Sequence, residues 1–412
     1  MTSPSRAAPL PALTGARFFA AFAVVVVHYG SGFVAAFVPA LQSTAAAGPA
    51  AVSFFYVLSG AVLTWGSTTP EGAPLRPART FWTQRVARIA PAYLFALLLS
   101  LGPFLHQLFA LHDGAAGMLR AIVVLAACVF AVQSFVPQLS TGLNTPGWSI
   151  SCEAFFYAAW PRLVVWLKDA RPGFPWRRCA ILWIPTLLPT LLGVAWVALA
   201  GAPEGPFRTA LEPVAGEEML RRTLTYFPPL RLAEFAMGVV LGHSLRKTAL
   251  GALERGGGWV RDTLRELGLL LALFAAATAL GGGLAGRLTG VDPLATRLSV
   301  ESGILSPLFA LLVWQLARGQ GLLQRFLSRA PLLALGEASY GLYILQEPVL
   351  VWFSAALKRG LPFLASRWEL GFVLYALLLV VLSLLTHRFI EIPVRKALLA
   401  RWARRPAAAQ VA

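Results

Sequence analysis

One apolar segment, ARFFAAFAVVVVHYG at residues 16–30, carries an arginine near its start and a histidine near its end. Arginine binds phosphates and carboxylates, and histidine takes up and releases protons near neutral pH. Eleven positions separate Arg17 from His28, so at about 100° per residue both lie on one helix face, roughly 16 Å apart along the axis. An ionisable side chain inside a membrane span is costly and points to a functional site. Taken alone, His28 is also compatible with a packed residue that hydrogen bonds a neighbouring helix.

A second candidate lies in NTPGWSISCEAFFYAAWP, residues 144–161, which begins with the turn-forming residues Asn, Thr, Pro and Gly. We expect Ser149 to cap the helix that follows, which places Glu153 in or near the first turn, where the helix dipole favours a carboxylate. A carboxylate can orient a histidine and stabilise its cation, so His28 and Glu153 form the predicted catalytic pair, with His28 as general base. The alternative is a capped helix with an acid and an aromatic belt at the membrane boundary.

Two arginines occur one helical turn apart in RTFWTQRVARIAPAY, residues 79–93. Arg85 and Arg88 project from one side, just before Pro91, which we expect to begin a helix. The planar guanidinium fork suits phosphate, so these arginines are candidates for binding a phosphorylated ligand. The alternative is that they only set the topology of the chain.

Polar residues also interrupt the apolar run EASYGLYILQEPVL, residues 337–350, which indicates a helix face that lines a cavity. Glu391, in HRFIEIPVRK at 387–396, is interpreted as part of an interfacial charge cluster. The residues predicted to contact substrate are Trp148, Ser149, Ser151, Tyr157, Tyr340 and Tyr343.

Composition identifies the class of protein that positions these residues. The 412 residues are 57% hydrophobic and 13% charged, whereas a soluble domain carries about 25% charged residues. Several apolar runs reach the roughly 20 residues that span a bilayer. The net charge of +17 resides mostly in short loops without basic–aromatic interleaving, which excludes a nucleic-acid partner. We predict a polytopic all-α membrane protein with candidate spans at 14–36, 50–67, 89–110, 119–137, 150–167, 179–200, 229–245, 264–284, 300–317, 333–356 and 369–389.

Eleven full spans conflict with the distribution of charge. Basic clusters follow the spans at 50–67 and 150–167, and both belong in the cytoplasm, which requires an even number of crossings between them. Three candidates lie there, so one segment within 89–167 is re-entrant, broken or half-spanning, and its irregular backbone is expected to line a cavity or lie buried in protein. We predict ten crossings in one domain, 1–412, with both termini cytoplasmic and a short tail from about 395. The three cysteines show neither disulfide nor metal spacing, so no metal is expected.

In order along the chain, these segments resemble the family-3 membrane acyltransferases, which O-acylate cell-envelope sugars and some secondary metabolites. LTGARFFAAFAVVVVHYG resembles the family's first helix, FWTQRVARIAPAYL its basic loop, and WSISCEAFFYAAWP its Trp–Ser–x–Ser–x–Glu segment. SYGLYILQEPV and HRFIEIP resemble its last two segments. The family often has Asp at the positions of Thr14 and Ser53 and His near Gln346 and Glu347, so we assign no role to these four residues.

The resemblance implies an integral protein of the bacterial inner membrane that takes acyl-CoA, with acetyl-CoA as first choice, from the cytoplasm. The acceptor is then a hydroxyl of a glycan or glycosylated compound, and no cofactor is permanently bound. Arg17, Arg85 and Arg88 would hold the CoA phosphates, while His28 and Glu153 act on the hydroxyl. A rival is a transporter or flippase for a lipid-linked sugar, with His28 and Glu153 as a proton relay. A third possibility is a non-catalytic protein of envelope assembly, which would tolerate alanine at Arg85 and His28.

Overall fold

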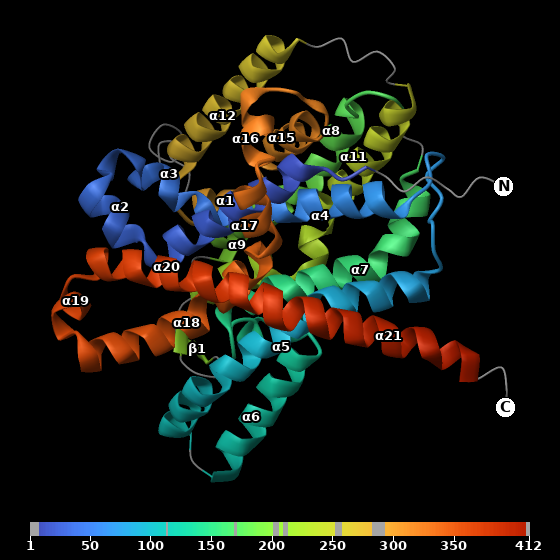
Figure 1. The fold of residues 1–412 in the computed structure, drawn as a ribbon. Coiled ribbons are helices and arrows are strands. Elements are labelled where there is room, and N and C mark those ends of the chain that lie inside the picture. Colours follow the sequence, from blue (N-terminus) through green and yellow to red (C-terminus); the bar gives the residue numbers. More distant parts are fainter. Residues whose placement is uncertain are drawn as a thin grey trace.

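The protein is a bundle of helices with one small hairpin. The structure, a computed structural model, describes residues 8–112, 114–168, 171–200, 206–208, 213–251, 258–281 and 293–408. In these ranges the strands β1 (Pro206–Arg208) and β2 (Pro213–Ala215) pair antiparallel, with Phe207 opposite Val214. The predicted all-α class is confirmed apart from this hairpin (Figure 1).

The first part of the chain, to residue 166, contains long helices joined by short 3₁₀ turns. Its elements are α1 (Pro11–Tyr29), α2 (Ser31–Phe37), η1 (Pro39–Leu41), α3 (Gln42–Ala46), η2 (Gly48–Ala50), α4 (Ala51–Ser67), α5 (Ala78–Leu111), α6 (Gly114–Val129), η3 (Gln133–Phe135), η4 (Pro137–Leu139), η5 (Thr145–Gly147) and α7 (Trp148–Trp166).

The second part contains several helices that break into two consecutive pieces. Its elements are α8 (Trp176–Thr186), α9 (Leu188–Ala200), α10 (Gly216–Tyr226), η6 (Pro228–Arg231), α11 (Leu232–Gly251), α12 (Trp259–Gly281), α14 (Pro293–Glu301), α15 (Ser306–Arg318), α16 (Leu322–Leu327), α17 (Ala330–Glu337), α18 (Ser339–Gly360), α19 (Pro362–Ser366), α20 (Trp368–Thr386), the π-helical turn η7 (His387–Glu391) and α21 (Ile392–Ala408).

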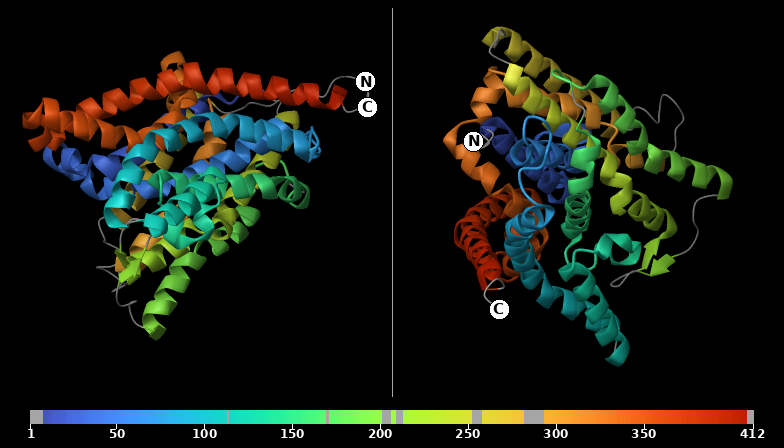
Figure 2. Two further views of the ribbon diagram at one scale, coloured as in Figure 1. Left: turned by 90° about the horizontal axis from the view of Figure 1, so that it is seen from below. Right: turned by 90° about the vertical axis from the view of Figure 1, so that its right-hand side faces the viewer.

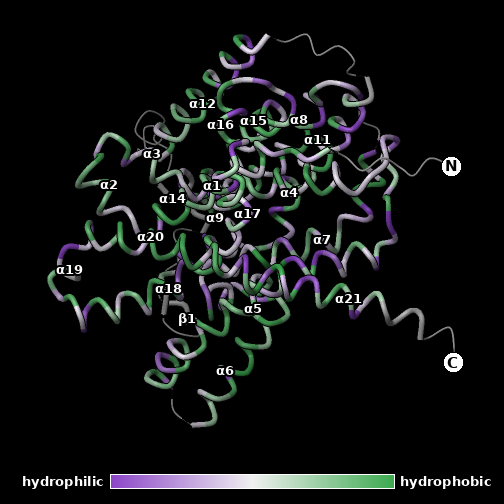
Figure 3. The backbone as a smooth tube through the Cα atoms, in the orientation of Figure 1, coloured by the Kyte–Doolittle hydropathy of each residue, from purple (hydrophilic) through white to green (hydrophobic). Residues whose placement is uncertain are grey.

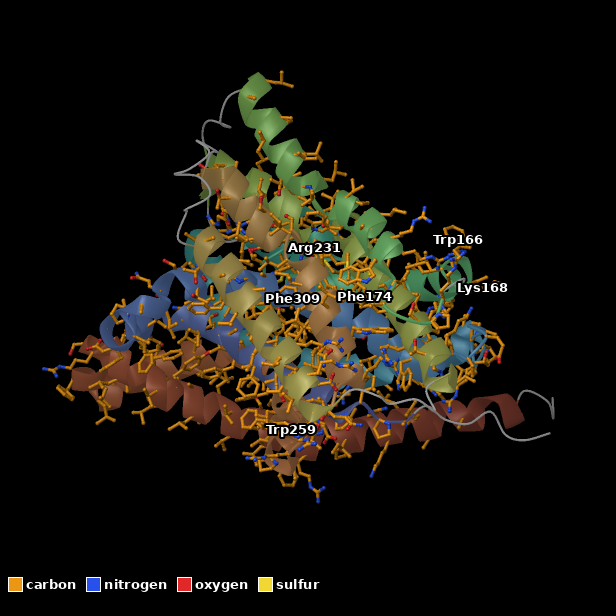
Figure 4. The ribbon with its side chains drawn as sticks, turned by 90° about the horizontal axis from the view of Figure 1, so that it is seen from above. Trp166, Lys168, Phe174, Arg231, Trp259 and Phe309 are labelled. Atoms are coloured by element: carbon orange, nitrogen blue, oxygen red, sulfur yellow. The ribbon has the colours of Figure 1, made fainter. Side chains whose placement is uncertain are left out.

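Most of the basic loops gather at one end of the bundle. The loop between α4 and α5 and the far end of α21 lie together at the right of Figure 1, and Figure 4 places Lys168 at the same end. The contacts agree, because Arg246 donates hydrogen bonds to the Thr68 carbonyl and Gly72 adjoins Lys168. We call this the basic end. Trp65 ties the first described residues to it through a 2.8 Å bond to the Ala8 carbonyl, and the two views of Figure 2 show α20 and α21 continuing as one rod that ends there.

Seven helical stretches within the described residues are long and apolar enough to cross a membrane, and Figure 3 shows mostly hydrophobic colour along outer helices such as α6 and α20. The protein is therefore an integral membrane protein. The count of ten crossings stays a prediction. Three interior helices, α7, α11 and α18, are not among these seven stretches. They carry polar side chains that are buried against other helices, and these lower their hydropathy.

The broken segment that the charge pattern requires lies at α6 and the residues after it. α6 has 16 residues, about 24 Å, which falls short of the roughly 30 Å hydrocarbon core. Between α6 and α7 the backbone forms only 3₁₀ turns and bends. Side chains satisfy part of this irregular backbone: Gln133 donates to the Gly147 carbonyl at 2.7 Å, and Asn144 to the Ile344 carbonyl at 2.9 Å. Residues 140–147 are buried or half-buried, whereas Phe130, Val132, Phe135 and Val136 are exposed. The prediction of irregular backbone enclosed in protein is therefore confirmed for the second half of this stretch only.

One predicted boundary is wrong. Pro91 does not begin a helix, because α5 starts at Ala78 and runs through Pro91. Proline inside a membrane helix is tolerated where neighbouring groups satisfy the freed carbonyl. As a result Arg85 and Arg88 lie on the helix itself, two to three turns from its start, rather than in a loop.

Close packing of α4 against α11 sets the centre of the bundle. A Cβ added to Gly60 would lie 2.2 Å from the Phe235 carbonyl oxygen, and one on Gly238 would lie 2.0 Å from that of Val57. Small residues of this kind let the backbones of membrane helices approach closely. The contact brings Ser53 and Tyr56 of α4 against the start of α11.

Candidate active site

A cavity of about 400 Å³ opens among α1, α4, α5, α7 and α18. It extends from Trp65 and Gly66 at the basic end to Tyr56, which lies about 14 Å deeper along α4. Eight of the eleven predicted site residues line it: Arg17, Arg85, Arg88, Ser149, Glu153, Tyr157, Tyr340 and Tyr343. We call it the cationic cavity.

Its three arginines come from two helices and are poorly neutralised. Arg88 lies 3.7 Å from Glu391 of η7, whereas neither Arg17 nor Arg85 forms an ion pair within the described residues. The Nε atom of Arg85 is buried and has no hydrogen-bond partner among the described residues. A buried donor without a partner is costly, so it marks a place that an acceptor from a ligand can fill.

Glu153 lies in this cavity and not beside the histidine. Tyr157, one turn later on α7, donates a short hydrogen bond to its carboxylate, and the charges nearest to Glu153 are Arg17, Arg85 and Arg88. The expected cap is absent: α7 begins at Trp148, Ser149 donates to the Pro146 carbonyl at 2.9 Å, and Glu153 falls in the second turn. The helix continues from the η5 turn without a polar cap, which moves its start two residues earlier than predicted.

His28 is held by Gln346 of α18. The Gln346 amide nitrogen donates to the Tyr343 carbonyl at 2.8 Å, so its oxygen faces His28 Nδ1 at 3.1 Å. An oxygen can only accept, and Nδ1 therefore carries the proton of the neutral ring. This leaves the lone pair on Nε2, which is the form that a general base needs.

The predicted pairing of His28 with Glu153 is not formed. No hydrogen bond or ion pair among the described residues joins them, and His28 does not line the cationic cavity. The prediction that Arg17 and His28 share a face is confirmed, because both face α18: Arg17 beside Tyr340 and Tyr343, and His28 beside Gln346. His28 therefore lies beyond the inner end of the cavity. Its partner Gln346 follows the lining residue Tyr343 by three positions, about 4.5 Å, while on α1 His28 lies about 16 Å past Arg17, the last described residue of that helix that lines the cavity.

A second cavity of about 350 Å³ lies on the other side of η5, among α5, α10, α18 and the segment 138–145. We call it the opposite cavity. Its arginines are neutralised: Arg221 forms a two-pronged pair with Glu218 and reaches Glu301 at 2.6 Å, and Arg222 bonds to Glu218 at 2.9 Å. Burial opposes ionisation of Glu218, but the hydrogen bonds from both arginines outweigh it and lower the pKa of Glu218 to about 2. Glu347 also lines this cavity and accepts two hydrogen bonds from Thr145.

The wall between the cavities is η5 and the start of α7. The Pro146 carbonyl accepts from Ser149 at 2.9 Å and from Tyr343 at 3.5 Å, both of which face the cationic cavity. Thr145, one residue earlier, faces the opposite cavity. On α18, Tyr343 borders one cavity and Glu347 the other, so Gln346 lies between them along the helix. His28, which contacts Gln346, lines neither cavity and is partly exposed.

Two predicted substrate contacts line neither cavity. Trp148 is 8% exposed and stacks on Tyr226 with ring centroids 4.2 Å apart. Ser151 is fully buried and accepts a bond from the backbone of Ser134 at 3.4 Å. Both lie on the side of α7 that faces the 133–135 turn and α10, so they hold the wall in place instead of facing a ligand.

The sequence analysis missed a buried ion pair at the centre of the molecule. Arg231, fully buried and labelled in the interior in Figure 4, pairs with Glu234 at 2.7 Å and donates to Ser53 at 3.1 Å. Its guanidinium also lies over the rings of Tyr56 and Trp148. The pair thus joins α4, α11 and the wall. The signal was present as two charges three residues apart at the start of an apolar helix, PPLRLAEF.

The fold and these cavities define a helical membrane protein with two polar cavities on either side of η5, and with a histidine bonded to α18, the helix that borders both. Comparison with known proteins identifies the class further: the Acyl_transf_3 model, described as an acyltransferase domain, matches residues 10–388. The chain belongs to this family and is an O-acyltransferase.

Two relatives illustrate the range of the family. Acyltransferase MdmB of Streptomyces mycarofaciens is 30% identical over 383 residues, which cover 89% of this chain and 85% of that protein. The Bacillus subtilis (strain 168) protein named "Putative peptidoglycan O-acetyltransferase YrhL" is 24% identical over 398 residues, 94% of this chain, and this chain spans about half of its length. No solved structure matches the chain significantly.

Proposed function

We propose that the protein transfers an acyl group, with acetyl as first choice, from acyl-CoA in the cationic cavity to a hydroxyl group of a glycan or glycosylated compound in the opposite cavity. The observation that carries the proposal is the set of three arginines in one cavity. Within the part of the chain that the structure describes, Arg17 and Arg85 form no ion pair, and the Nε atom of Arg85 is buried without a hydrogen-bond partner. A diphosphate supplies the acceptors and negative charge that these groups lack.

The donor enters from the basic end, which we assign to the cytoplasm of a bacterial inner membrane because basic residues gather there. Its thioester then points inward, past Tyr343, toward His28. The pantetheine arm is long and thin, and apolar residues such as Val52, Phe55 and Leu63 provide matching walls along the cavity.

The proposed reaction uses His28 as the base. Nε2 of His28 takes the proton of the acceptor hydroxyl, and the oxygen forms a bond to the acyl carbon. The carbon–sulfur bond then breaks, and the thiolate of CoA takes up the proton from the imidazolium. Gln346 keeps Nδ1 protonated throughout, so the basic nitrogen always faces the reactants.

Glu153 takes a different part from the one expected from sequence. It lies among the arginines, hydrogen bonded to Tyr157, and holds no contact with His28. We propose that it limits the positive charge of the cavity, so that the phosphates bind without being retained after transfer.

The opposite cavity suits a polyhydroxylated acceptor. Carboxylate, guanidinium, amide and hydroxyl groups line it, together with the rings of Phe104 and Tyr226. Planar polar groups bond to neighbouring hydroxyls, and an aromatic ring packs on the apolar face of a sugar.

The test is release of free thiol by purified protein from a panel of acyl-CoAs, with crude envelope glycans or glycosylated metabolites as acceptors. We expect acceptor-dependent release of CoA and label in the acceptor from acyl-labelled donor. A transporter or flippase releases no CoA. If folded protein, supplied with acceptor, releases no free thiol from any of the donors, the proposal is overturned.

A further inference from the structure

A third hollow, of about 470 Å³, opens at the basic end beside the mouth of the cationic cavity. Ala8, Pro9, Leu10 and Trp65 border both spaces, so the two adjoin each other at these residues. The bond from Trp65 to the Ala8 carbonyl holds this short stretch of chain against α4. We call the third space the side hollow.

The side hollow is lined by cations without acid partners. Arg318 projects from the end of α15 and Arg325 from α16, and neither takes part in an ion pair of the described residues. The Trp314 ring packs under the Arg318 guanidinium at 5.0 Å. Two acids border this region, and both are engaged by backbone groups. Asp262 accepts from the Gln320 backbone at 3.0 Å and lies 3.7 Å from Arg265, and Glu266 accepts from the backbones of Leu323 and Gln324 at 2.8 and 3.2 Å.

The neutral groups of the side hollow also favour a phosphorylated nucleoside. Gln320 and Gln324 supply amide groups for hydrogen bonds. Trp65 supplies a half-buried ring, and bases stack on aromatic rings and on guanidinium planes. Another hollow at the basic end, bordered by Arg76 and Trp160, has one cation and shares no lining residue with the cationic cavity.

The size of the donor explains why it needs a second space. Pockets for drug-sized ligands measure about 300–1,000 Å³, and the cationic cavity, at about 400 Å³, is at the low end of that range. An acyl-CoA is larger than such ligands and carries phosphate at two separate places, the diphosphate in the middle and the 3′-phosphate on the ribose. With the thioester at the inner end, the nucleotide must leave through the mouth, which is where the side hollow lies.

We propose that the side hollow binds the 3′-phosphorylated adenosine of the acyl-CoA donor, with Arg318 and Arg325 on the 3′-phosphate. The inference rests on the proposed function, because it assigns a second part of the same donor. It makes the protein selective for coenzyme A esters over donors that carry the same acyl group on a shorter phosphopantetheine. An anionic lipid headgroup presents similar phosphate chemistry, and the experiment below separates the two.

The experiment compares acetyl-CoA with acetyl-3′-dephospho-CoA as donors for full-length protein in neutral-lipid nanodiscs. We expect the unmodified protein to lose about 10- to 100-fold in kcat/KM when the 3′-phosphate is absent, the range of a lost charge-assisted contact. Arg318→Ala/Arg325→Ala should show the same loss with acetyl-CoA and no further loss with the dephospho donor. Arg329→Ala is the matched control, because Arg329 belongs to the same basic region, stacks on Phe326 and does not line the side hollow.

The ratio between donors is read within one protein sample, so a partial loss of folded protein does not alter it. If the double variant fails to fold, Arg325→Ala alone, at an exposed position, provides the same ratio. A double variant that keeps the full preference for acetyl-CoA overturns the inference while acyl transfer itself stands. Release of no thiol from either donor by the unmodified protein overturns the proposed function as well. A variant that alters only the response to added phosphatidylglycerol makes the arginines a lipid contact and also overturns the inference.

Discussion

The cationic cavity and the opposite cavity both contain arginines, but only one of them neutralises its charge internally. In the opposite cavity Arg221 and Arg222 are bonded to Glu218, and Arg221 also to Glu301. In the cationic cavity Arg17 and Arg85 lack any ion pair among the described residues. The volumes, about 400 and 350 Å³, are similar.

This difference separates arginines that are available to bind a ligand from arginines that hold helices together. Arginines that carboxylates already satisfy have few donors left for a ligand, and here they hold α10 and α14 together beside the opposite cavity. Arginines without partners keep their donors free, and the cost of burying them is recovered only when an anion arrives. We therefore expect substitutions in the two cavities to affect different kinetic constants, and His28 to affect neither binding step.

The largest expected effect is that of His28→Ala. Removing the base should lower kcat about 10²- to 10⁴-fold, the usual contribution of general acid–base catalysis, while calorimetric binding of acyl-CoA stays nearly unchanged. Thermal unfolding of the variant in the same detergent serves as the control for folding. A folded variant that retains near-normal turnover would make His28 a packing residue and remove the link between the cavities.

The second-largest kinetic effect is expected for Arg85→Ala. Loss of a charge-assisted phosphate contact raises the KM for acyl-CoA about 10- to 100-fold, and lysine restores only part of the affinity because it lacks the planar fork. Arg222→Ala, in the opposite cavity, is the matched control and should raise the KM for the acceptor instead. Equal effects of both variants on the donor constant would erase the distinction between the cavities.

Gln346→Met tests the link between the cavities. A methionine side chain has nearly the volume of glutamine, but its thioether is too weak an acceptor for the His28 Nδ1–H group. The imidazole ring therefore loses the hydrogen bond that fixes its tautomer. One hydrogen bond of this kind is worth about 0.5–1.5 kcal/mol, so kcat should fall about 2- to 10-fold at constant KM for both substrates. An altered KM for either substrate, with kcat intact, would place Gln346 in substrate binding.

Glu153→Gln should produce a smaller change of opposite sign. Among the described residues that line the cationic cavity, Glu153 is the one with a carboxylate. Its removal should lower the KM for acyl-CoA about 1.4- to 5-fold, the range of a weak electrostatic contact. Tyr157→Phe, which removes the hydrogen bond but keeps the charge, should not lower that KM. If Glu153→Gln instead reduces kcat as strongly as His28→Ala, then the pair expected from sequence operates despite its separation in the structure.

The smallest effect concerns pH. The pKa of Glu218 is about 2 in the folded protein and about 4.3 in an unfolded chain. Its stabilising contribution is therefore complete above about pH 4.3 and is lost as the pH falls toward 2. Across pH 5–8 the difference in unfolding temperature between the unmodified protein and Glu218→Gln should stay constant. A difference that changes in this range would show that the arginine network titrates there.

Much of the fold and part of the site could be predicted from sequence. The broken segment near α6 followed from charge counting, because the positive-inside rule constrains parity. Eight of the residues that line the cationic cavity were predicted as site residues from their type and segment. Pro91 was misjudged because local preference for a helix start was outweighed by neighbouring helices that accommodate proline inside α5.

The partner of the histidine could not be predicted. His28 and Gln346 are 318 positions apart, and nothing in either segment specifies the distance between α1 and α18. Glu153 was chosen because a carboxylate is the usual partner of a catalytic histidine, but the orientation of α7 directs it to the arginines. Arg318 and Arg325 belong to no motif in the sequence, and only the packing of α15 and α16 places them in the same hollow as Trp65.

The sequence by itself determined the helical membrane class, the basic end and the shared face of Arg17 and His28. These depend on composition and on the period of the α-helix, which are local properties. Only the tertiary structure decided which helix each face meets. Lipid is as apolar as the outer side chains, so helix pairing depends on small residues and buried polar contacts spread over the whole chain. The division of the polar interior into a cationic and a neutralised cavity follows from that packing.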